Sequence, residues 1–171
     1  NARPEGKNPI QVELSIEKVH NMRIAYLKLE RTNNISHSFS LLWKQLLQFS
    51  ENYELPSKGC KYVSLTLDYP FITLEEQSRF MVGVTLPQSF KIPKGFGVYE
   101  VPAGEYAIFR FKGLYHELNR VYRYIYLDWL PANDYSLRDP FTFETYINTP
   151  EKTPVSELIT DIYIPVKKKE I

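Results

Sequence analysis

The segment Thr142–Ile147 places a carboxylate between aromatic side chains, and it is the part of the sequence best suited to do chemistry. Its residues read Thr-Phe-Glu-Thr-Tyr-Ile, an alternation typical of a β-strand, although glutamate is unfavourable in strands. A buried carboxylate without a partner is costly and tends to take up a proton. Glu144 therefore either faces water, pairs with an arginine or lysine, or awaits a cation.

Tyr146 lies two residues after Glu144, so both side chains point to the same face of the predicted strand. A carboxylate and an aromatic ring on one face suit the recognition of an organic cation. Cation–π contact adds about 0.5–2 kcal/mol, and the carboxylate supplies charge specificity. The same residues allow a second chemistry, in which Glu144 is a general base that positions water and a tyrosine is the acid. Binding and hydrolysis of a reactive ligand both stay open at this point.

Other aromatic side chains could line a groove around this pair or could belong to the ordinary core. Rings at helical spacing are usually core residues, but a buried tyrosine hydroxyl still needs a hydrogen-bond partner, which favours the edge of a groove. Glu157, expected on the strand that adjoins Glu144, could add a second negative charge or lie exposed at the start of that strand. The aromatic candidates are Tyr26, Trp43, Tyr62, Tyr122, Tyr126 and Trp129.

The other residue types that often carry chemistry lack the necessary spacing. The three histidines form no ligand pair, so we expect no metal ion. Cys60 is the single cysteine, which excludes a disulfide within the chain and suits a reducing compartment. The Gly95–Gly97 segment precedes a predicted strand, whereas a phosphate loop precedes a helix. We predict no cofactor, and no catalytic residue except Glu144 in the hydrolytic alternative.

Length and charge restrict the class of protein. The chain has 171 residues, of which 43% are hydrophobic and 24% charged, as is typical of one globular domain. The formal net charge of +1 gives no basic footprint for direct binding of nucleic acid. No apolar run is long enough to span a membrane, and the start of the chain lacks an apolar signal core. A cytoplasmic location is therefore expected.

Strands and helices that position these side chains are predicted from hydrophobic periodicity. One helix is expected from Ser36 or Ser38 to about Tyr53, and a second over residues 114–130, where Pro131 ends it. The segment from Asp134 to Asp139 is expected to be a loop. The predicted strands cover residues 11–19, 22–30, 61–67, 78–86, 97–101, 105–111, 142–147 and 158–166.

The two halves of the chain correspond piece by piece, each in the order strand, strand, helix, strand, strand. Arg23–Leu27 resembles Glu105–Phe109, and Val84–Pro87 resembles Ile162–Pro165 at a slightly smaller offset. We therefore predict an α+β fold: a tandem repeat of two strand-strand-helix-strand units, each completed by a further strand. Together they form one antiparallel sheet with two helices over one face and a groove between them.

Several segments resemble a known family in their order and spacing. Over residues 10–166 the chain resembles the GyrI-like small-molecule-binding domain, which is also the effector-binding domain of AraC-type and MerR-type transcription regulators. The resemblance implies a tandem βαββ-type fold with a groove for organic, often cationic and aromatic, ligands. It also implies a buried glutamate that pairs with the ligand cation, a role that falls on Glu144. The segments that carry it are Asn21–Tyr26, Pro102–Gly113, Trp129–Pro131, Phe143–Tyr146 and Glu157–Pro165.

These observations predict the effector-binding domain of a bacterial transcription regulator that senses small, cationic or aromatic organic molecules. We expect a linker or tag remnant at 1–9, the domain at 10–166 in two halves (about 10–87 and 96–166), and a tail at 167–171. The absence of an initial Met favours a DNA-binding domain upstream, through which alone DNA would be contacted. The alternative is a stand-alone relative that hydrolyses reactive drugs or inhibits DNA gyrase through protein contact. A protein partner or homodimer stays open, and no membrane partner is expected.

Overall fold

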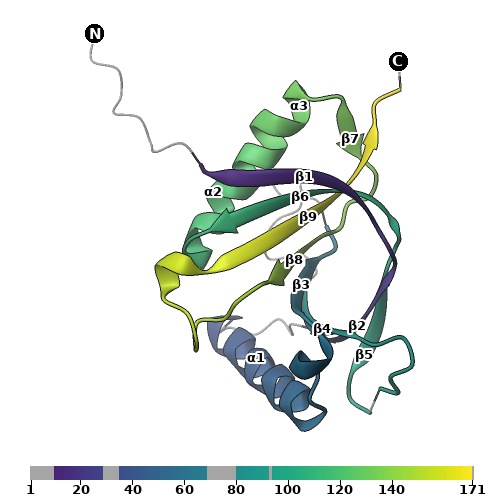
Figure 1. Cartoon of the computed structure of the whole chain (residues 1–171), viewed down its shortest axis with the longest axis vertical. Helices are drawn as coiled ribbons and strands as arrows, with labels where there is room; N and C mark the ends of the chain where they lie inside the picture. The colour runs from purple at the N-terminus through teal and green to yellow at the C-terminus, as the bar shows by residue number, and fades with distance from the viewer. Residues whose placement is uncertain (1–9, 29–34, 69–79, 93, 171) are drawn as a thin grey trace.

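The computed structural model describes residues 10–28, 35–68, 80–92 and 94–170, with the side chains of the first helix described from Ser40 onward. The linker predicted at 1–9 lies outside the described residues. The strands form one curved antiparallel sheet in the order β1-β6-β9-β8-β3-β4-β2-β5, and the short strand β7 pairs with the end of β9 (Figure 1). This arrangement confirms the predicted α+β fold.

Within its described residues, the N-terminal half contains four strands and one long helix. The helix, α1 (Ile35–Asn52), follows the second strand, and a short 3-10 turn at Pro56–Lys58 leads from it back to the sheet. The strands of this half are β1 (Val12–Val19), β2 (Met22–Lys28), β3 (Tyr62–Thr66) and β4 (Phe80–Leu86).

The C-terminal half repeats this order with a more irregular helical segment. A 3-10 turn (Tyr115–Glu117) leads into α2 (Leu118–Arg123), a π-helical turn (Tyr124–Trp129) and the short α3 (Leu130–Ala132). The strands of this half are β5 (Gly97–Val101), β6 (Gly104–Lys112), β7 (Tyr135–Leu137), β8 (Thr142–Tyr146) and β9 (Ile159–Lys168).

The strand order shows that the two halves are related by a pseudo-two-fold axis. Each strand of one half has a counterpart in the other: β1 corresponds to β5, β2 to β6, β3 to β8 and β4 to β9. When each strand is replaced by its counterpart, the strand order of the sheet reads as the original order in reverse. The axis therefore passes between β3 and β8, the two strands at which the halves meet. There Ser64 lies directly opposite Glu144.

Strand pairing also corrects one part of the predicted repeat. Ala25 in β2 pairs with Val84 in β4, and Ala107 in β6 pairs with Ile164 in β9. The two alanines correspond to each other, as predicted, so the counterpart of Val84 is Ile164 and not Ile162. The prediction aligned Pro87 with Pro165, but these two prolines are not equivalent. Pro165 lies inside β9, whereas Pro87 follows the end of β4.

Both helical segments cover the same face of the sheet, as predicted. Alternate strand residues point to opposite faces, and Ala25, Val82 and Val84 pack with Leu46 and Phe49 of α1. The equivalent positions in the other half pack under the second helical segment, and these are Ala107, Phe109, Ile162 and Ile164 with Leu118, Val121, Ile125 and Trp129. A third cluster fills the opposite, inner face of the curved sheet, with Ile24, Val63, Leu65, Tyr106, Ile108 and Phe143 among its members.

Three local predictions were wrong in detail. The second helix passes Pro131 and ends at Ala132. Proline lacks an N–H but fits the first turn of a helix, which is where it lies in α3 after the π-helical turn. The loop expected after this helix contains β7, whose residues pair with the end of β9. This pairing extends β9 to Lys168, two residues beyond the predicted boundary at Val166.

Candidate functional site

A cavity of about 390 Å³ lies at the junction of the two halves, on the face of the sheet that the helices cover. Its volume is within the usual range of small-molecule sites. The sheet near the pseudo-two-fold axis forms its floor, and α1, the start of the second helical segment and the turn after β8 form its walls. The lining residues are Trp43, Leu47, Tyr62, Ser64, Phe80, Tyr115, Leu118, Glu144, Tyr146, Thr149, Pro150 and Glu151.

Glu144 is the half-buried acidic residue on the floor of this cavity. The Tyr122 hydroxyl of α2 donates a hydrogen bond to its Oε2 at 2.6 Å, and the Tyr146 hydroxyl donates one to its Oε1 at 3.2 Å. Tyr146 also shares a hydrogen bond with the Ser64 hydroxyl from the neighbouring strand. Both carboxylate oxygens are thus held in place by donors from a helix and from the sheet.

Alternation along β8 explains why Glu144 and Tyr146 point toward the helices. Phe143 belongs to the core cluster on the other face of the sheet, so the residues on either side of it in sequence point toward the helices. The pairing of Ser64 with Glu144, and of Tyr62 with Tyr146, brings the polar residues of both strands to the same face.

Burial raises the pKa of Glu144 above its ordinary value, and the hydrogen bonds from Tyr122 and Tyr146 oppose part of this rise. Burial and the nearby carboxylate of Glu144 raise the pKa of both tyrosines well above the ordinary value, so their hydroxyls remain donors at neutral pH. Among the described residues that line the cavity, none is a lysine or arginine. The cavity therefore offers a carboxylate with oriented donors, and the described part of its lining supplies no lysine or arginine.

Aromatic rings surround this carboxylate. The Tyr146 ring lies between Trp43 and Tyr115, with centroids at 5.7 Å and 5.6 Å and interplanar angles of 74° and 66°. Trp43 also meets the edge of Tyr62 at 6.2 Å, and the Tyr62 hydroxyl shares a 2.9 Å hydrogen bond with Ser50 of α1. These edge-to-face contacts hold the rings as a wall that can contact both apolar and cationic groups.

Five of the predicted site residues come together here. Glu144, Tyr146, Trp43 and Tyr62 line the cavity. Tyr122 holds the carboxylate by its hydrogen bond.

Two predicted aromatic residues of the groove belong to other parts of the molecule. Tyr26 follows Ala25, which faces α1, so it points to the opposite face, where a Cβ on Gly97 would lie 2.3 Å from its ring. Trp129 is 6% exposed in the core, where it meets Phe109 edge-on at 5.1 Å. Both assignments to the groove were wrong, because side-chain type alone does not show which face an aromatic residue occupies.

Two further predicted residues also lie outside the cavity lining. Tyr126 packs, partly buried, against the core cluster beneath the second helical segment. Glu157 is exposed in the 3-10 turn Val155–Glu157, ahead of β9 and not within it. The second carboxylate of the cavity is Glu151, on the turn after β8.

Sequence reasoning missed four polar lining residues, which are Ser64, Tyr115, Thr149 and Glu151. The number of residues between Ser64 and Glu144 equals that between Val84 and Ile164. The repeat therefore identifies Ser64 as the counterpart of Glu144. Tyr115 lies seven residues before Tyr122 and shares its helical face. Glu151 has no comparable signal, because its place depends on a turn whose shape the periodicity does not report.

The described residues contain neither a metal-binding cluster nor a membrane-spanning helix. In that part of the chain, no group of three or more His, Cys, Asp and Glu side chains is arranged to hold a metal ion. Within the same residues, no helix is both long and apolar enough to cross a membrane.

Comparison with known proteins identifies the family. Residues 13–167 match the GyrI-like small molecule binding domain. The chain belongs to this family. A DNA gyrase inhibitor of Serratia proteamaculans (strain 568) is 30% identical over 129 residues, which cover 73% of this chain and 80% of that protein.

Solved structures share the fold at lower identity. The EcmrR C-terminal domain has a TM-score of 0.69 at 17% identity, with 92% of this chain and 98% of that domain covered. In the EcmrR–DNA complex, this chain spans 58% of the EcmrR chain, with a TM-score of 0.69 at 18% identity. SAV2435 bound to tetraphenylphosphonium has a TM-score of 0.59 at 16% identity, with 91% of this chain and 94% of that one covered.

Proposed function

We propose that this GyrI-like domain binds small organic cations with aromatic groups and serves as the ligand-sensing part of a bacterial transcription regulator. The observation that carries the proposal is the carboxylate of Glu144, held by Tyr122 and Tyr146 on the floor of an aromatic cavity. SAV2435, which shares the fold, was solved with tetraphenylphosphonium, a ligand of the class proposed here.

The energetics favour a cation over a neutral ligand of the same shape. Half-burial makes the negative charge of Glu144 costly, and a bound cation offsets that cost. The face of an aromatic ring adds cation–π attraction of about 0.5–2 kcal/mol. A ligand of about 25 heavy atoms at roughly −0.3 kcal/mol per atom reaches about −7.5 kcal/mol, which corresponds to micromolar affinity. This affinity suits a sensor of compounds that enter the cell.

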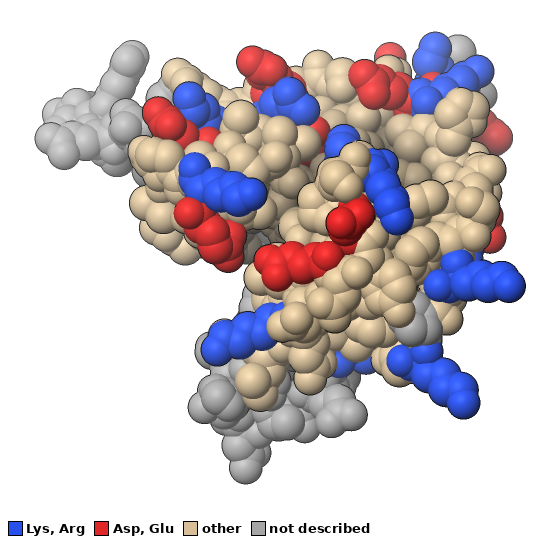
Figure 2. Space-filling view, turned by 60° about the horizontal axis from the view of Figure 1, so that its bottom comes forward, with Lys and Arg blue, Asp and Glu red and all other residues tan. Residues whose placement is uncertain are grey.

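The position of the cavity supports a sensing role. Trp43 belongs to α1 of one half, whereas Tyr115 and Leu118 belong to the helical segment of the other. A ligand that contacts both halves favours whichever arrangement of the helices fits it best, and this is how a ligand shifts a conformational equilibrium. In a regulator, DNA contact would come from a separate domain, because the formal net charge of this chain is only +1. The face that Figure 2 shows carries acidic as well as basic side chains.

The proposal is tested with two ions of the same shape and opposite charge. Tetraphenylphosphonium and tetraphenylborate are titrated calorimetrically into the wild type and into Glu144→Gln. The wild type should bind the phosphonium with micromolar Kd and the borate far more weakly. Glu144→Gln should weaken phosphonium binding about 100-fold, since removing one member of a buried charge pair costs about 2–5 kcal/mol. Equal binding of both ions by the wild type contradicts the proposal.

Inhibition of DNA gyrase is a second candidate, favoured by the 30% identity to a DNA gyrase inhibitor. It requires contact between this chain and gyrase, and it does not require an occupied cavity. In a supercoiling assay with purified gyrase, inhibition that persists in Glu144→Gln would support this role. Full gyrase activity at excess chain would exclude it.

A further inference from the structure

The turn after β8 brings a second carboxylate to the cavity. Thr149, Pro150 and Glu151 all line it, and Glu151 is exposed, whereas Glu144 lies half-buried on the floor. The two acidic side chains are therefore at different depths of one cavity: one at the sheet and one where the cavity opens to solvent.

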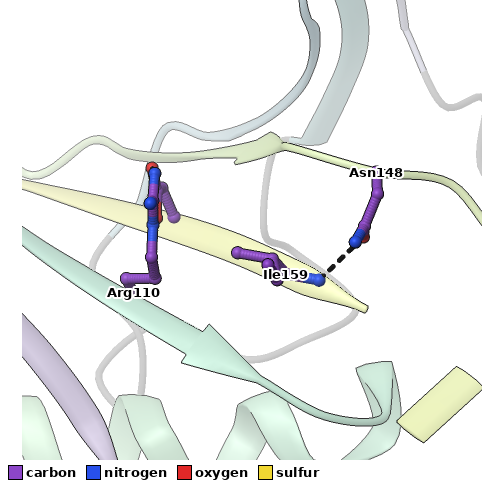
Figure 3. A network of polar contacts seen from close by, with 4 residues as sticks. Arg110, Asn148 and Ile159 are labelled. Atoms are coloured by element: carbon purple, nitrogen blue, oxygen red, sulfur yellow. Dashed lines mark hydrogen bonds and ion pairs between the residues drawn. The ribbon is translucent and has the colours of Figure 1, made fainter. Parts of the chain in front are cut away.

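Hydrogen bonds hold this turn in one place. The Lys152 N–H donates to the carbonyl of Thr149 at 3.2 Å and closes the turn around Glu151. At its base the Asn148 side chain accepts from the Ile159 N–H at 2.8 Å (Figure 3). The same side chain donates to the carbonyl of Glu157 at 3.1 Å. Asn148 thus ties the end of β8 to the start of β9, and Glu151 is presented from a fixed base.

Tyr115 lies near both carboxylates, so the two negative charges belong to one part of the cavity. Its ring contacts Tyr146 at 5.6 Å, next to Glu144. Its pKa is raised by burial and then by the negative charges of Glu151 and Glu144. The lining residues described by the structure contain these two acids and no lysine or arginine. A ligand with one positive charge can therefore neutralise one of the two carboxylates, and no lysine or arginine among these lining residues neutralises the other.

We propose that Glu151 makes the cavity selective for organic dications, with one charge against Glu144 and the second beside Glu151 at the opening. This inference rests on the proposed function, because it assigns a second contact to the same ligand. The two contacts differ in strength. Exposed ion pairs are weak and screened by salt, so Glu151 should give a two- to five-fold preference that disappears in high salt. The contact at Glu144, which is less exposed, should depend on salt much less.

Ethidium and propidium are the probes, because they share one aromatic cation and propidium carries a second quaternary ammonium group. Their dissociation constants are measured by fluorescence at low salt for the wild type, Glu151→Gln and Glu157→Gln. Glu157 is the matched control, since it is an exposed glutamate of the same connection that does not line the cavity. The wild type and Glu157→Gln should prefer propidium two- to five-fold, and Glu151→Gln should bind both dyes equally.

The outcomes separate this inference from the proposed function. A preference for propidium that survives in Glu151→Gln, or that is lost equally in Glu157→Gln, overturns the role of Glu151 and leaves cation binding at Glu144 intact. Equal affinity of the wild type for the two dyes also overturns it. Failure of the wild type to bind either dye contradicts the proposed function and the dication inference together.

Discussion

The two halves of the domain share one arrangement of strands but contribute different chemistry to the cavity between them. At the pseudo-two-fold axis, Ser64 of the first half lies opposite Glu144 of the second. The first half supplies a neutral wall, in which Trp43 and Tyr62 are the main rings, whereas the second supplies both carboxylates of the cavity. The repeat thus builds a symmetric scaffold, and the side chains on it make the two sides of the cavity chemically different.

The same contrast holds for the hydrogen bonds that join each helix to the sheet. In the first half, Tyr62 of the sheet shares a hydrogen bond with Ser50 of α1. In the second, Tyr122 of α2 donates to Glu144 of the sheet. Both tyrosines tie a helix to the sheet, but only Tyr122 does so through a charged group. The difference indicates that the first connection stabilises the fold and the second also sets the charge of the cavity.

The largest expected effect is a loss of thermal stability when the two halves are made alike at the pseudo-two-fold axis. In Ser64→Glu a second carboxylate would lie directly opposite Glu144, at a position that is 3% exposed. Like charges that face each other across strands are unfavourable, and an uncompensated buried charge costs about 3–5 kcal/mol. Thermal unfolding at pH 7.5 should show a Tm lower by roughly 10 °C, and the loss should shrink as the pH falls and one carboxyl takes up a proton.

Ser64→Gln is the control for this substitution, because it adds similar bulk without the charge. Its Tm should fall less than that of Ser64→Glu at pH 7.5, and its deficit should not depend on pH. Equal Tm values for the two variants at pH 7.5 would show that charge repulsion at the axis is absent.

The next prediction concerns ligand affinity and the neutral wall of the first half. Trp43→Ala removes a ring that contacts both Tyr62 and Tyr146, and loss of such an anchor costs about 2 kcal/mol of binding, or roughly 30-fold in Kd. Because the ring acts mainly by packing, tetraphenylphosphonium and the neutral triphenylphosphine oxide should both weaken in calorimetry, and the phosphonium should lose at most a further cation–π contribution of about 0.5–2 kcal/mol. Trp43→Phe should retain much of the affinity. Weakening of the phosphonium alone would assign charge recognition to Trp43 and contradict the division between the halves.

The remaining comparison is between the two tyrosines that tie a helix to the sheet. Tyr122→Phe removes a hydrogen bond to a charged group, worth about 1.5–3 kcal/mol, and Tyr62→Phe removes a neutral one, worth about 0.5–1.5 kcal/mol. Tyr122→Phe should raise the pKa of Glu144 further and weaken phosphonium binding as the pH falls toward that pKa. Tyr62→Phe keeps the ring of the wall, so it should lower the Tm and leave the pH dependence of binding unchanged. Equal effects on binding would show that Tyr122 does not act through the carboxylate.

The fold could be predicted from the sequence because its signals are local or repeated. Alternation marked the strands, and the similarity of the halves implied one sheet with two helices. The register of the last strand could not be predicted, because two prolines suggested Ile162 as the counterpart of Val84, whereas strand pairing makes it Ile164. The strand β7 also escaped prediction, since its few residues are too short for a periodic signal.

The site could be predicted where side-chain type and period agreed. Glu144 and Tyr146 share a face by alternation, and the structure places both in the cavity. Tyr26 and Trp129 could not be assigned correctly, since an aromatic residue suits the core as well as a groove, and tertiary packing decides between them. Glu157 was predicted to add a second negative charge from the adjoining strand, whereas Glu151 lines the cavity and Glu157 does not. Only the folded turn shows which acid reaches the opening.

The pH dependence of tetraphenylphosphonium binding tests the central claim most directly, because this ion does not titrate and the pKa of Glu144 lies above its ordinary value. Protonation of Glu144 removes the charge that attracts the cation, so affinity should rise with pH through that raised pKa and then level off. In Glu144→Gln the affinity should be low and independent of pH over the same range. Parallel pH profiles in the two proteins would show that another group recognises the charge and would contradict the account.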